Sequence, residues 1–427
     1  MQLRRRANGL RERARRVLPG GYGRSTFAVG PDSPYAVRGD GYRLWDDTGA
    51  ELIDLNNNFT ALVHGHANEH IAEAATAAMR AGVSFGLPNE HELEHAEALL
   101  ARLPDADVVR YTNSGTEAVM TALRIARAHT GRNRCIVIRD AYHGTSDGVL
   151  AAGGPRSRRG VPAGVLAETT VLGLNDRASL GEAVERHGTE LAAVLIDLLP
   201  NRAGLVAADP EYVQELVRLR REHGVLLISD EVIAFRLRWD GWSASYDLAP
   251  DLTVLGKLIG GGFPVGAIAG RRAVMQELNP LLARGLEHGG TFSGNPVTMA
   301  AGLASLDLLD PPAVERLNRL GDEARAHLAE SIAPLGWTVR GTGSLLRPWP
   351  PGTAAERTDR ARQLWWAAYG RGLLLNPSGL VALSTPMDAD VTAYVVAELT
   401  AAAADVAGGW RMPGADGASA RPPDGPG

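Results

Sequence analysis

Lysine is almost absent from this sequence of 427 residues. Of its 44 basic residues all but one are arginines, and the exception is Lys257. The only cysteine, Cys135, excludes an internal disulfide, and its apolar surroundings at 134–138 predict burial in a strand. A chain without disulfides fits a reducing compartment, so we expect a cytoplasmic protein.

Long apolar runs and a strong excess of one charge are also absent. No run reaches the roughly 18 apolar residues that a membrane span requires, and the N-terminal segment has charge but no apolar stretch of the signal-peptide type. The net charge of −5 and the pI near 6.1 give no general attraction to nucleic acid or to an anionic membrane. We therefore expect neither as a partner.

The sequence does contain enough apolar material for a large folded protein. With 45% hydrophobic residues over this length, two or three packed units are expected and disorder as the main state is excluded. From about residue 105, strand-like runs alternate with helical periodicity. The strand-like runs are 108–112, 134–139, 192–199, 225–230 and 252–255, and the helical segments are 115–129, 177–187 and 210–222. This alternation predicts an α/β fold with a largely parallel sheet covered by helices on both faces.

The two ends of the chain carry different patterns. Near the N-terminus, the segments 42–45 and 52–55 flank a short turn and predict a β-hairpin. In the last third of the chain, a strand-like stretch at 337–349 among helical segments predicts a second, smaller α+β unit, with a boundary near 305–312. The helices expected there cover 297–309, 312–332, 355–370 and 388–405. We expect residues 408–427, rich in glycine and proline, to form a flexible tail.

Polar residues follow the predicted strands at the edge where a parallel sheet binds ligands. Ser114, Gly115 and Thr116 open a helix directly after a strand, so that N–H groups and two hydroxyls make a phosphate site. Glu117 equally allows a capping box without a ligand. After the next strand, Tyr142 is placed either to stack on a planar heterocycle or to wedge between sheet and helix.

Asp230 and Glu231 end an apolar strand. A buried carboxylate at this place needs a cationic or donor partner, which a protonated ring nitrogen would provide. Two acids on a solvated loop are the alternative. We expect no metal site, because no further histidine or acid lies at ligand spacing nearby.

Lys257 follows another strand and precedes a glycine-rich loop. Since arginine serves wherever else a cation suffices, we infer that this position requires an amine that can lose its proton and condense with a carbonyl. The alternative is that one lysine has remained by chance in a sequence whose composition favours arginine. Nucleotide loops do not fit, because Asp251 and Val265 stand where the two glycine patterns need glycine. A phosphate cradle, a stacking ring, a carboxylate and a reactive amine are together the parts that pyridoxal phosphate requires.

With these residues in place, the sequence resembles the fold-type I, class III aminotransferases, and within them the glutamate-1-semialdehyde aminomutases and the β-amino-acid aminotransferases. The resemblance runs from about residue 18 to about residue 399. It rests on five strings in the family's order, which are SGTEA at 114–118, YHG at 142–144, DEV at 230–232, GK at 256–257 and GTFSGNP at 290–296.

The resemblance implies a fold and a domain organisation. A large domain, 66–305, would carry a mainly parallel seven-stranded sheet covered by helices. A smaller α+β domain would be formed by the N-terminal segment 1–65 together with residues 306–407.

The resemblance also implies roles for the site residues. Lys257 would carry the cofactor, pyridoxal 5′-phosphate, as a Schiff base and then move protons. Asp230 would face the ring nitrogen, and Tyr142 and Val232 would sandwich the ring. The phosphate would be held by Ser114, Gly115 and Thr116, and by Thr291 from the second subunit of a homodimer.

The substrate side departs from the mutase pattern. Phe27 takes the position of the mutase's arginine, whereas Arg24 stands where related β-amino-acid aminotransferases have an arginine for the substrate carboxylate, and a guanidinium fork suits a carboxylate. Arg202 would offer a second contact, either to the substrate carboxylate or to the phenolate oxygen of the cofactor. Phe59 and Phe85 would line the same pocket, with core packing as the alternative for both.

These observations predict an aminotransferase that transfers an amino group from a β-amino acid, or a related ω-amino compound, to a keto acid by a ping-pong mechanism. A 2,1-aminomutase of the glutamate-1-semialdehyde type is the alternative. The two differ in that a mutase turns over without any added keto acid. A catalytically idle binding protein on the same fold is a third possibility, and it would not depend on Lys257.

Overall fold

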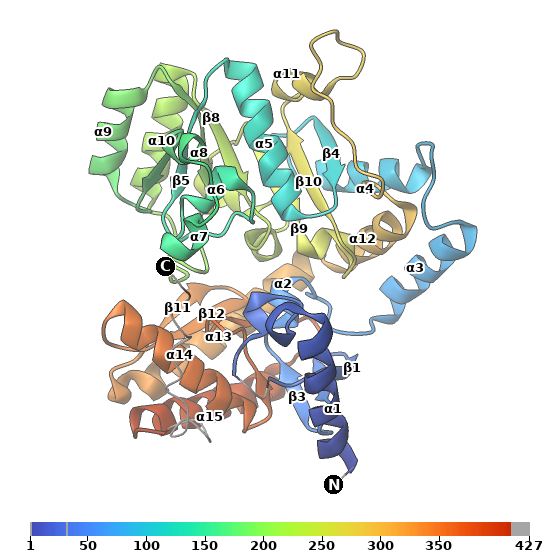
Figure 1. Cartoon of the computed structure of the whole chain (residues 1–427), viewed down its shortest axis with the longest axis vertical. Coiled ribbons are helices and arrows are strands. Elements are labelled where there is room, and N and C mark those ends of the chain that lie inside the picture. Colours follow the sequence, from blue (N-terminus) through green and yellow to red (C-terminus); the bar gives the residue numbers. More distant parts are fainter. Residues whose placement is uncertain (1, 31–32, 411–427) are drawn as a thin grey trace.

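A seven-stranded sheet forms the centre of the computed structural model, which describes residues 2–30 and 33–410 (Figure 1). Its strand order is β4-β10-β9-β8-β7-β5-β6, and all neighbouring pairs are parallel except those made by β10. The strands are β4 (Val108–Thr112), β5 (Arg134–Ile138), β6 (Thr169–Leu172), β7 (Leu191–Ile196), β8 (Leu226–Asp230), β9 (Leu252–Gly256) and β10 (Gly266–Gly270). The predicted fold class, a mainly parallel seven-stranded sheet with helices, is confirmed.

The central strands are apolar throughout because both faces of the sheet are covered. In β5, Cys135 and Val137 pack into one core, and Ile136 and Ile138 pack into another. Helix α5 (Gly115–Thr130) contributes to the first core, and α9 (Arg177–His187) and α10 (Pro210–His223) contribute to the second. Successive side chains of a strand point to opposite faces, so the two cores lie on opposite sides of the sheet. The predicted burial of Cys135 is confirmed.

Two smaller sheets are built from the two ends of the chain, which meet below the central sheet in Figure 1. The first has the order β1-β2-β3-β13 and includes the predicted hairpin; the second has the order β11-β12-β14. Their strands are β1 (Ala36–Asp40), β2 (Arg43–Asp46), β3 (Glu51–Asp54), β11 (Thr338–Thr342), β12 (Leu345–Trp349), β13 (Leu373–Leu374) and β14 (Val381–Ala382). Because β13 pairs with β3 in parallel, N- and C-terminal segments share one sheet. The domain boundaries after residues 65, 305 and 407 remain predictions.

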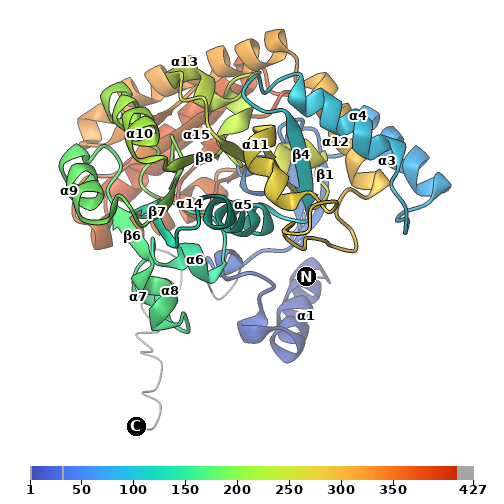
Figure 2. The same ribbon diagram turned by 90° about the horizontal axis from the view of Figure 1, so that it is seen from above.

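Helices complete the fold, and Figure 2 shows α13 and α15 along one side and α3 and α4 at the far end. The long C-terminal helices are α13 (Pro311–Ile332), α14 (Ala354–Tyr369) and α15 (Ala389–Ala407). The others are α1 (Gln2–Val17), α2 (Asn57–Thr60), α3 (Glu69–Ala81), α4 (Glu90–Leu100), α6 (Asp147–Leu150), α7 (Pro155–Arg158), α8 (Ala163–Ala167), α11 (Arg272–Met275) and α12 (Pro296–Leu308). Of the helices in the described residues, none has the length and apolar character to cross a bilayer.

The predicted flexible tail falls almost wholly outside the described residues. Gly408, Gly409 and Trp410 follow α15, and Trp410 packs against the C-terminal core. The remaining tail, 411–427, is not part of the described chain.

Candidate active site

A pocket of about 560 Å³ opens at the carboxyl ends of the parallel strands. It is lined by residues that follow five different strands, among them Ser114 after β4, Tyr142 after β5, Arg202 after β7, Asp230 at the end of β8 and Lys257 after β9. The structure thus brings together residues from Arg24 to Leu380, which lie 356 positions apart in the sequence. Nine of the sequence-predicted residues other than Lys257 line this pocket: Arg24, Phe59, Ser114, Gly115, Thr116, Tyr142, Arg202, Asp230 and Val232.

Lys257 starts a short 3-10 turn directly after β9 and has a φ of 53°. A positive φ is rare for a residue with a side chain and marks a backbone held in place by its surroundings. Burial lowers the pKa of the Lys257 amine to about 8, although the charges of Asp230 and Asp197 act in the opposite direction. A larger share of this amine is therefore neutral near physiological pH than for an ordinary lysine.

Asp230 is held by two contacts at the base of the pocket. Its Oδ1 accepts a hydrogen bond from the Val232 amide at 3.1 Å, and its Oδ2 lies 2.7 Å from His143 Nδ1. Both side chains are buried, and His143 Nε2 has no hydrogen-bond partner among the described residues. The carboxylate is therefore fixed in orientation, with a buried imidazole behind it.

Asp197 is a second buried carboxyl group in the same pocket, and the sequence analysis missed it. It follows β7, whose Ile196 is the strand partner of Ser229 in β8, so it lies beside Asp230. Burial, reinforced by the charge of Asp230, raises the pKa of Asp197 to about 7, while His143 and Lys257 act to lower it. The signal in the sequence was an acid at the end of an apolar strand, the same signal that singled out Asp230.

The N-terminus of α5 points into the pocket beside these groups. Ser114 Oγ accepts a hydrogen bond from the Glu117 amide at 3.1 Å, and Glu117 Oε2 accepts one from the Asn113 amide at 2.7 Å. The Ser114 half of the expected capping box is therefore present, but Glu117 reaches past the N-cap residue to the Asn113 amide, so the box is not complete. A Cβ on Gly115 would lie 3.0 Å from Val232 Cγ2, so glycine keeps the start of the helix open. The amide groups of the first turn and the helix dipole make this end suited to an anion.

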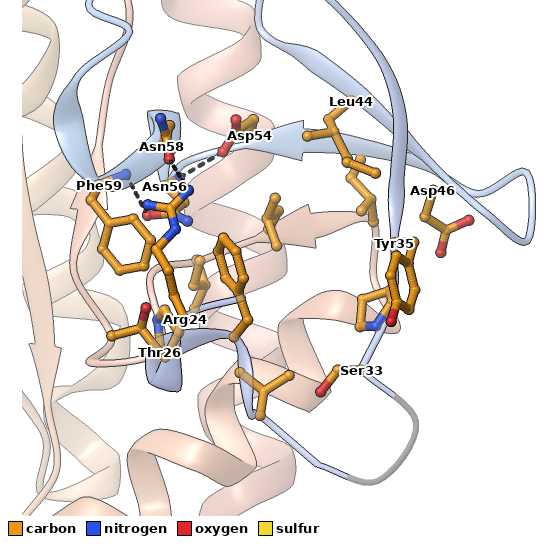
Figure 3. Close-up of a pocket in the computed structure, with 18 of the residues that line it drawn as sticks. Arg24, Thr26, Ser33, Tyr35, Leu44, Asp46, Asp54, Asn56, Asn58 and Phe59 are labelled. Atoms are coloured by element: carbon orange, nitrogen blue, oxygen red, sulfur yellow. Dashed lines mark hydrogen bonds between the residues drawn. The ribbon is translucent and has the colours of Figure 1, made fainter. Parts of the chain in front are cut away.

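Two arginines face the pocket from different parts of the chain. The Arg24 guanidinium lies 4.4 Å from the centroid of the Phe27 ring and 5.6 Å from that of Phe59, and it donates to Asn58 Oδ1 at 3.3 Å (Figure 3). The Arg202 guanidinium lies 4.1 Å from the centroid of the Tyr142 ring. Both contacts are of the cation–π type and leave hydrogen-bond donors for a ligand carboxylate.

Helix α2 places Phe59 and is in fact a left-handed turn. Four consecutive residues, Asn57 to Thr60, have φ values between 47° and 73°. Such a turn costs roughly 1–2 kcal/mol per residue, so hydrogen bonds must hold it. Asp54 Oδ1 accepts from the Asn56 and Asn57 amides, and Asn57 Nδ2 donates to the Ala382 carbonyl at 2.6 Å. Strain of this kind concentrates at functional sites.

Two predicted residues are not brought into the pocket of this chain. Phe85 does not line it: the connection between α3 and α4 runs along the outside of the molecule, and the Phe85 ring lies half-exposed against Gly82, so its place in the substrate pocket stays a prediction. Thr291 is exposed on the surface. Since Thr291 was assigned to the second subunit, that prediction stays untested.

Comparison with known proteins assigns the family. The class-III aminotransferase profile matches residues 28–389. This protein belongs to the class-III aminotransferases. It is 39% identical over 397 residues to the glutamate-1-semialdehyde 2,1-aminomutase of Thermomicrobium roseum. The alignment covers 87% of this chain and 91% of that protein.

Solved structures of other class-III aminotransferases are similar over almost the whole chain. An ω-transaminase from Sphaerobacter thermophilus shares 40% identity with a TM-score of 0.90, covering 94% of this chain and 98% of that one. A transaminase with PLP bound shares 38% identity with a TM-score of 0.91, covering 95% and 98%. A β-phenylalanine aminotransferase from Variovorax paradoxus shares 31% identity with a TM-score of 0.87, covering 94% of each chain.

The family depends on pyridoxal phosphate, and the pocket of this chain fits that group. It offers a helix N-terminus for a phosphate, a glycine that keeps the approach open, a fixed carboxylate for a ring nitrogen, and an amine of lowered pKa. No group of three or more His, Cys, Asp or Glu side chains in the described ranges is arranged to hold a metal ion.

Proposed function

We propose that this class-III aminotransferase transfers an amino group from a β-amino acid, or a related ω-amino compound, to a keto acid by a ping-pong reaction. The observation that carries the proposal is the Arg24 guanidinium in the catalytic pocket, held over Phe27 and hydrogen-bonded to Asn58. A guanidinium fork binds a carboxylate through two parallel hydrogen bonds. The similar solved structures described as an ω-transaminase and a β-phenylalanine aminotransferase support this choice.

The residues of the pocket have separate tasks in this proposal. When bound, pyridoxal phosphate supplies an aldehyde that reacts with amines and a ring that takes up electron density. Lys257 binds the cofactor and moves a proton through its Nζ, and Asp230 holds a proton on the ring nitrogen. Tyr142 and Val232 cover the two faces of the ring.

The phosphate and the substrate are held at opposite ends of the pocket. Ser114, Gly115 and Thr116 bind the phosphate at the start of α5, and Thr291 of the partner subunit completes that site in a homodimer. Arg24 and Phe59 bind the substrate, with Arg202 as a second carboxylate ligand. The single cysteine, buried in β5, supports a cytoplasmic location for this dimer.

The second candidate is a 2,1-aminomutase, which the name of the Thermomicrobium relative favours. The two candidates differ in what they consume, because a mutase moves the amino group within one substrate. Turnover without any added keto acid would identify a mutase.

A half-reaction screen tests the proposal. The holoenzyme is mixed with α-, β- and ω-amino acids one at a time, and the cofactor absorption is followed. β-Amino acids are expected to convert the cofactor to its amine form without a second substrate, and a keto acid should restore it. If only α-amino acids react, or if no amine does, the assigned substrate class is wrong.

Substitution of Arg24 tests the residue that carries the proposal. Arg24→Ala should raise KM for amino acids about 10–100-fold, which corresponds to the loss of a charged hydrogen bond of roughly 1.5–3 kcal/mol. Amines without a carboxylate should be little affected. Arg38→Ala, which removes an exposed arginine stacked on Trp45 away from the pocket, is the control. Equal losses for both kinds of amine would remove Arg24 from carboxylate binding.

A further inference from the structure

A second cavity of about 580 Å³ lies beside the catalytic pocket (Figure 3). It is lined by residues of the segments 18–29 and 33–66 on one side and by residues of α14 and β13 on the other. Arg24, Thr26, Asn58, Phe59 and Pro377 line both spaces, so the two cavities adjoin along a common wall. This volume is in the range of cavities that hold a small organic ligand.

The second cavity offers an apolar surface, although several polar side chains border it. Asp46 accepts hydrogen bonds from the Thr48 and Ala50 amides and from the Tyr369 hydroxyl. Asp54 is engaged by two backbone amides, and its Oδ2 lies 2.7 Å from His66 Nε2. Because these carboxylates already have their partners within the protein, a polar ligand gains little there.

Apolar side chains make up much of the rest of the wall. They come from β2, β3, α14, β13 and the adjoining loops, and include Leu44, Leu52, Leu62, Trp365, Leu374 and Leu375. Burial of an apolar group against such a surface is favourable by about 25 cal/mol per Å². The cavity is therefore suited to a hydrocarbon or aryl group.

We propose that the second cavity receives an apolar substituent on the Cα of a β-amino acid substrate, so that the preferred donors are β-alanines with a long alkyl or aryl group on Cα. The inference rests on the proposed function. Arg24 stands in the wall that the two spaces share, and it is the residue proposed to bind the carboxylate. A substituent on Cα starts from the same carbon that bears the carboxylate, so a carboxylate on Arg24 places that substituent at the entrance of the second cavity. A substituent on Cβ starts from the carbon that bears the amine, next to Lys257, and is directed elsewhere.

Two homologous series of donors test the inference on the holoenzyme. In the first series the alkyl chain is on Cα of β-alanine, and in the second it is on Cβ. For the first series kcat/KM of the half-reaction should rise about fourfold per methylene, the fold-change equal to about 0.8 kcal/mol. The second series should show no such rise. A rise in the second series alone, or in neither, overturns the inference.

Substitutions at Leu44, labelled in the cavity wall in Figure 3, locate the effect. Leu44→Trp should abolish the gain with chain length on Cα, and Leu44→Ala should extend it to longer chains, when kcat/KM of each variant is expressed relative to that variant's own value for β-alanine. Val37→Trp, on the exposed strand β1, is the control and should change neither. If Leu44→Trp and Leu44→Ala both keep the wild-type length dependence, the chain does not enter this cavity.

Binding of unreactive acids provides a readout without turnover. Propanoic acids with an alkyl chain on Cα lack the amine, and calorimetry on the holoenzyme should show their affinity rising with chain length, with the gain lost in Leu44→Trp. If no donor of either series reacts, the proposed function fails. If donors of these series react but neither the Cα series nor these acids depend on chain length, only the cavity assignment fails.

Discussion

The base of the pocket places four titratable side chains together, and their mutual influence decides how Lys257 behaves. Asp197 and Asp230 come from neighbouring strands, His143 stands behind Asp230, and Lys257 follows the next strand along the sheet. The lowered pKa of Lys257 is thus the balance of burial, which favours the neutral amine, and two acids, which favour the ammonium.

This balance predicts how the apoprotein takes up its cofactor. Only a neutral amine attacks an aldehyde, so the rate of pyridoxal phosphate uptake should rise as the pH rises through about 8, measured as the growth of cofactor absorption. Asp197→Asn removes a charge that raises the Lys257 pKa, so the midpoint should move to lower pH. Glu330→Gln, an exposed change on α13, is the control. A midpoint near that of an ordinary lysine, or one that Asp197→Asn leaves in place, would contradict this account.

Among the elements, helix α12 supports the turn that carries Lys257. The two pack closely, because a Cβ on Gly302 of α12 would lie 2.1 Å from the Ile259 carbonyl oxygen. The same carbonyl lies 2.7 Å from His95 Nε2 of the neighbouring helix α4. Glycine at position 302 therefore sets how near α12 approaches the catalytic turn.

Substitution of this glycine should displace Lys257 without touching the pocket. Gly302→Ala is expected to cost about 1–3 kcal/mol of unfolding free energy through overpacking and to lower cofactor occupancy, measured by urea titration and by absorbance after dialysis. Gly181→Ala, in α9 with open space around it, should instead stabilise by about 0.4–1 kcal/mol. Full cofactor occupancy and a wild-type unfolding free energy in Gly302→Ala would show that α12 can shift away from the Ile259 carbonyl without moving Lys257.

The elements that the sequence predicted are those with a strong local signal. Five strands of the large sheet are rich in apolar residues, and their predicted bounds agree with the structure to within three residues. Strand β10 was missed because glycines at both of its ends resemble a loop. The structure supplies the reason for one of them: a Cβ on Gly266 would lie 2.1 Å from the Ser114 carbonyl oxygen. Local pattern does not reveal such a close approach between distant segments.

Site residues could be predicted from the sequence where the chemistry requires one residue type. They were harder to predict where their role depends on which distant segments lie side by side. Lys257 and Asp230 stood out by type and position. Asp197 carries the same signal, an acid at the end of an apolar strand, but its place beside Asp230 depends on which strands are neighbours in the sheet, and a local pattern does not show that. The left-handed turn at Asn57–Thr60 has no sequence signal apart from its asparagines, since it is held by hydrogen bonds that Asn57 donates to the Asp54 carboxylate and to the Ala382 carbonyl.

At the scale of the whole molecule, two buried histidines contact residues of other segments and make the unfolding free energy depend on pH. His64 contacts the Ser305 carbonyl and Thr385, and His95 contacts Tyr111 and the Ile259 carbonyl. Burial lowers the pKa of both histidines to about 4. The unfolded chain binds protons below about pH 6.5, whereas the folded protein does not until about pH 4, so acid favours the unfolded state.

The unfolding free energy should therefore fall as the pH is lowered from about 6.5 to about 4, with each histidine accounting for about 3 kcal/mol. Urea titrations at a series of pH values measure the slope. His95→Asn should flatten it, even if the variant is less stable at neutral pH, whereas His70→Asn, an exposed change in α3, should not. An unchanged slope in His95→Asn would show that other groups control the acid response.

The pairing of β13 with β3 has a consequence for how the protein is made. Leu373 and Leu374 complete a sheet whose other strands are contributed by residues 36–54, so more than 300 residues must be translated before that sheet can close. During this interval the N-terminal hairpin leaves the ribosome with one edge uncovered. The central sheet, which needs nothing beyond residue 270, can form first on the nascent chain, and the N-terminal strands wait for the C-terminus.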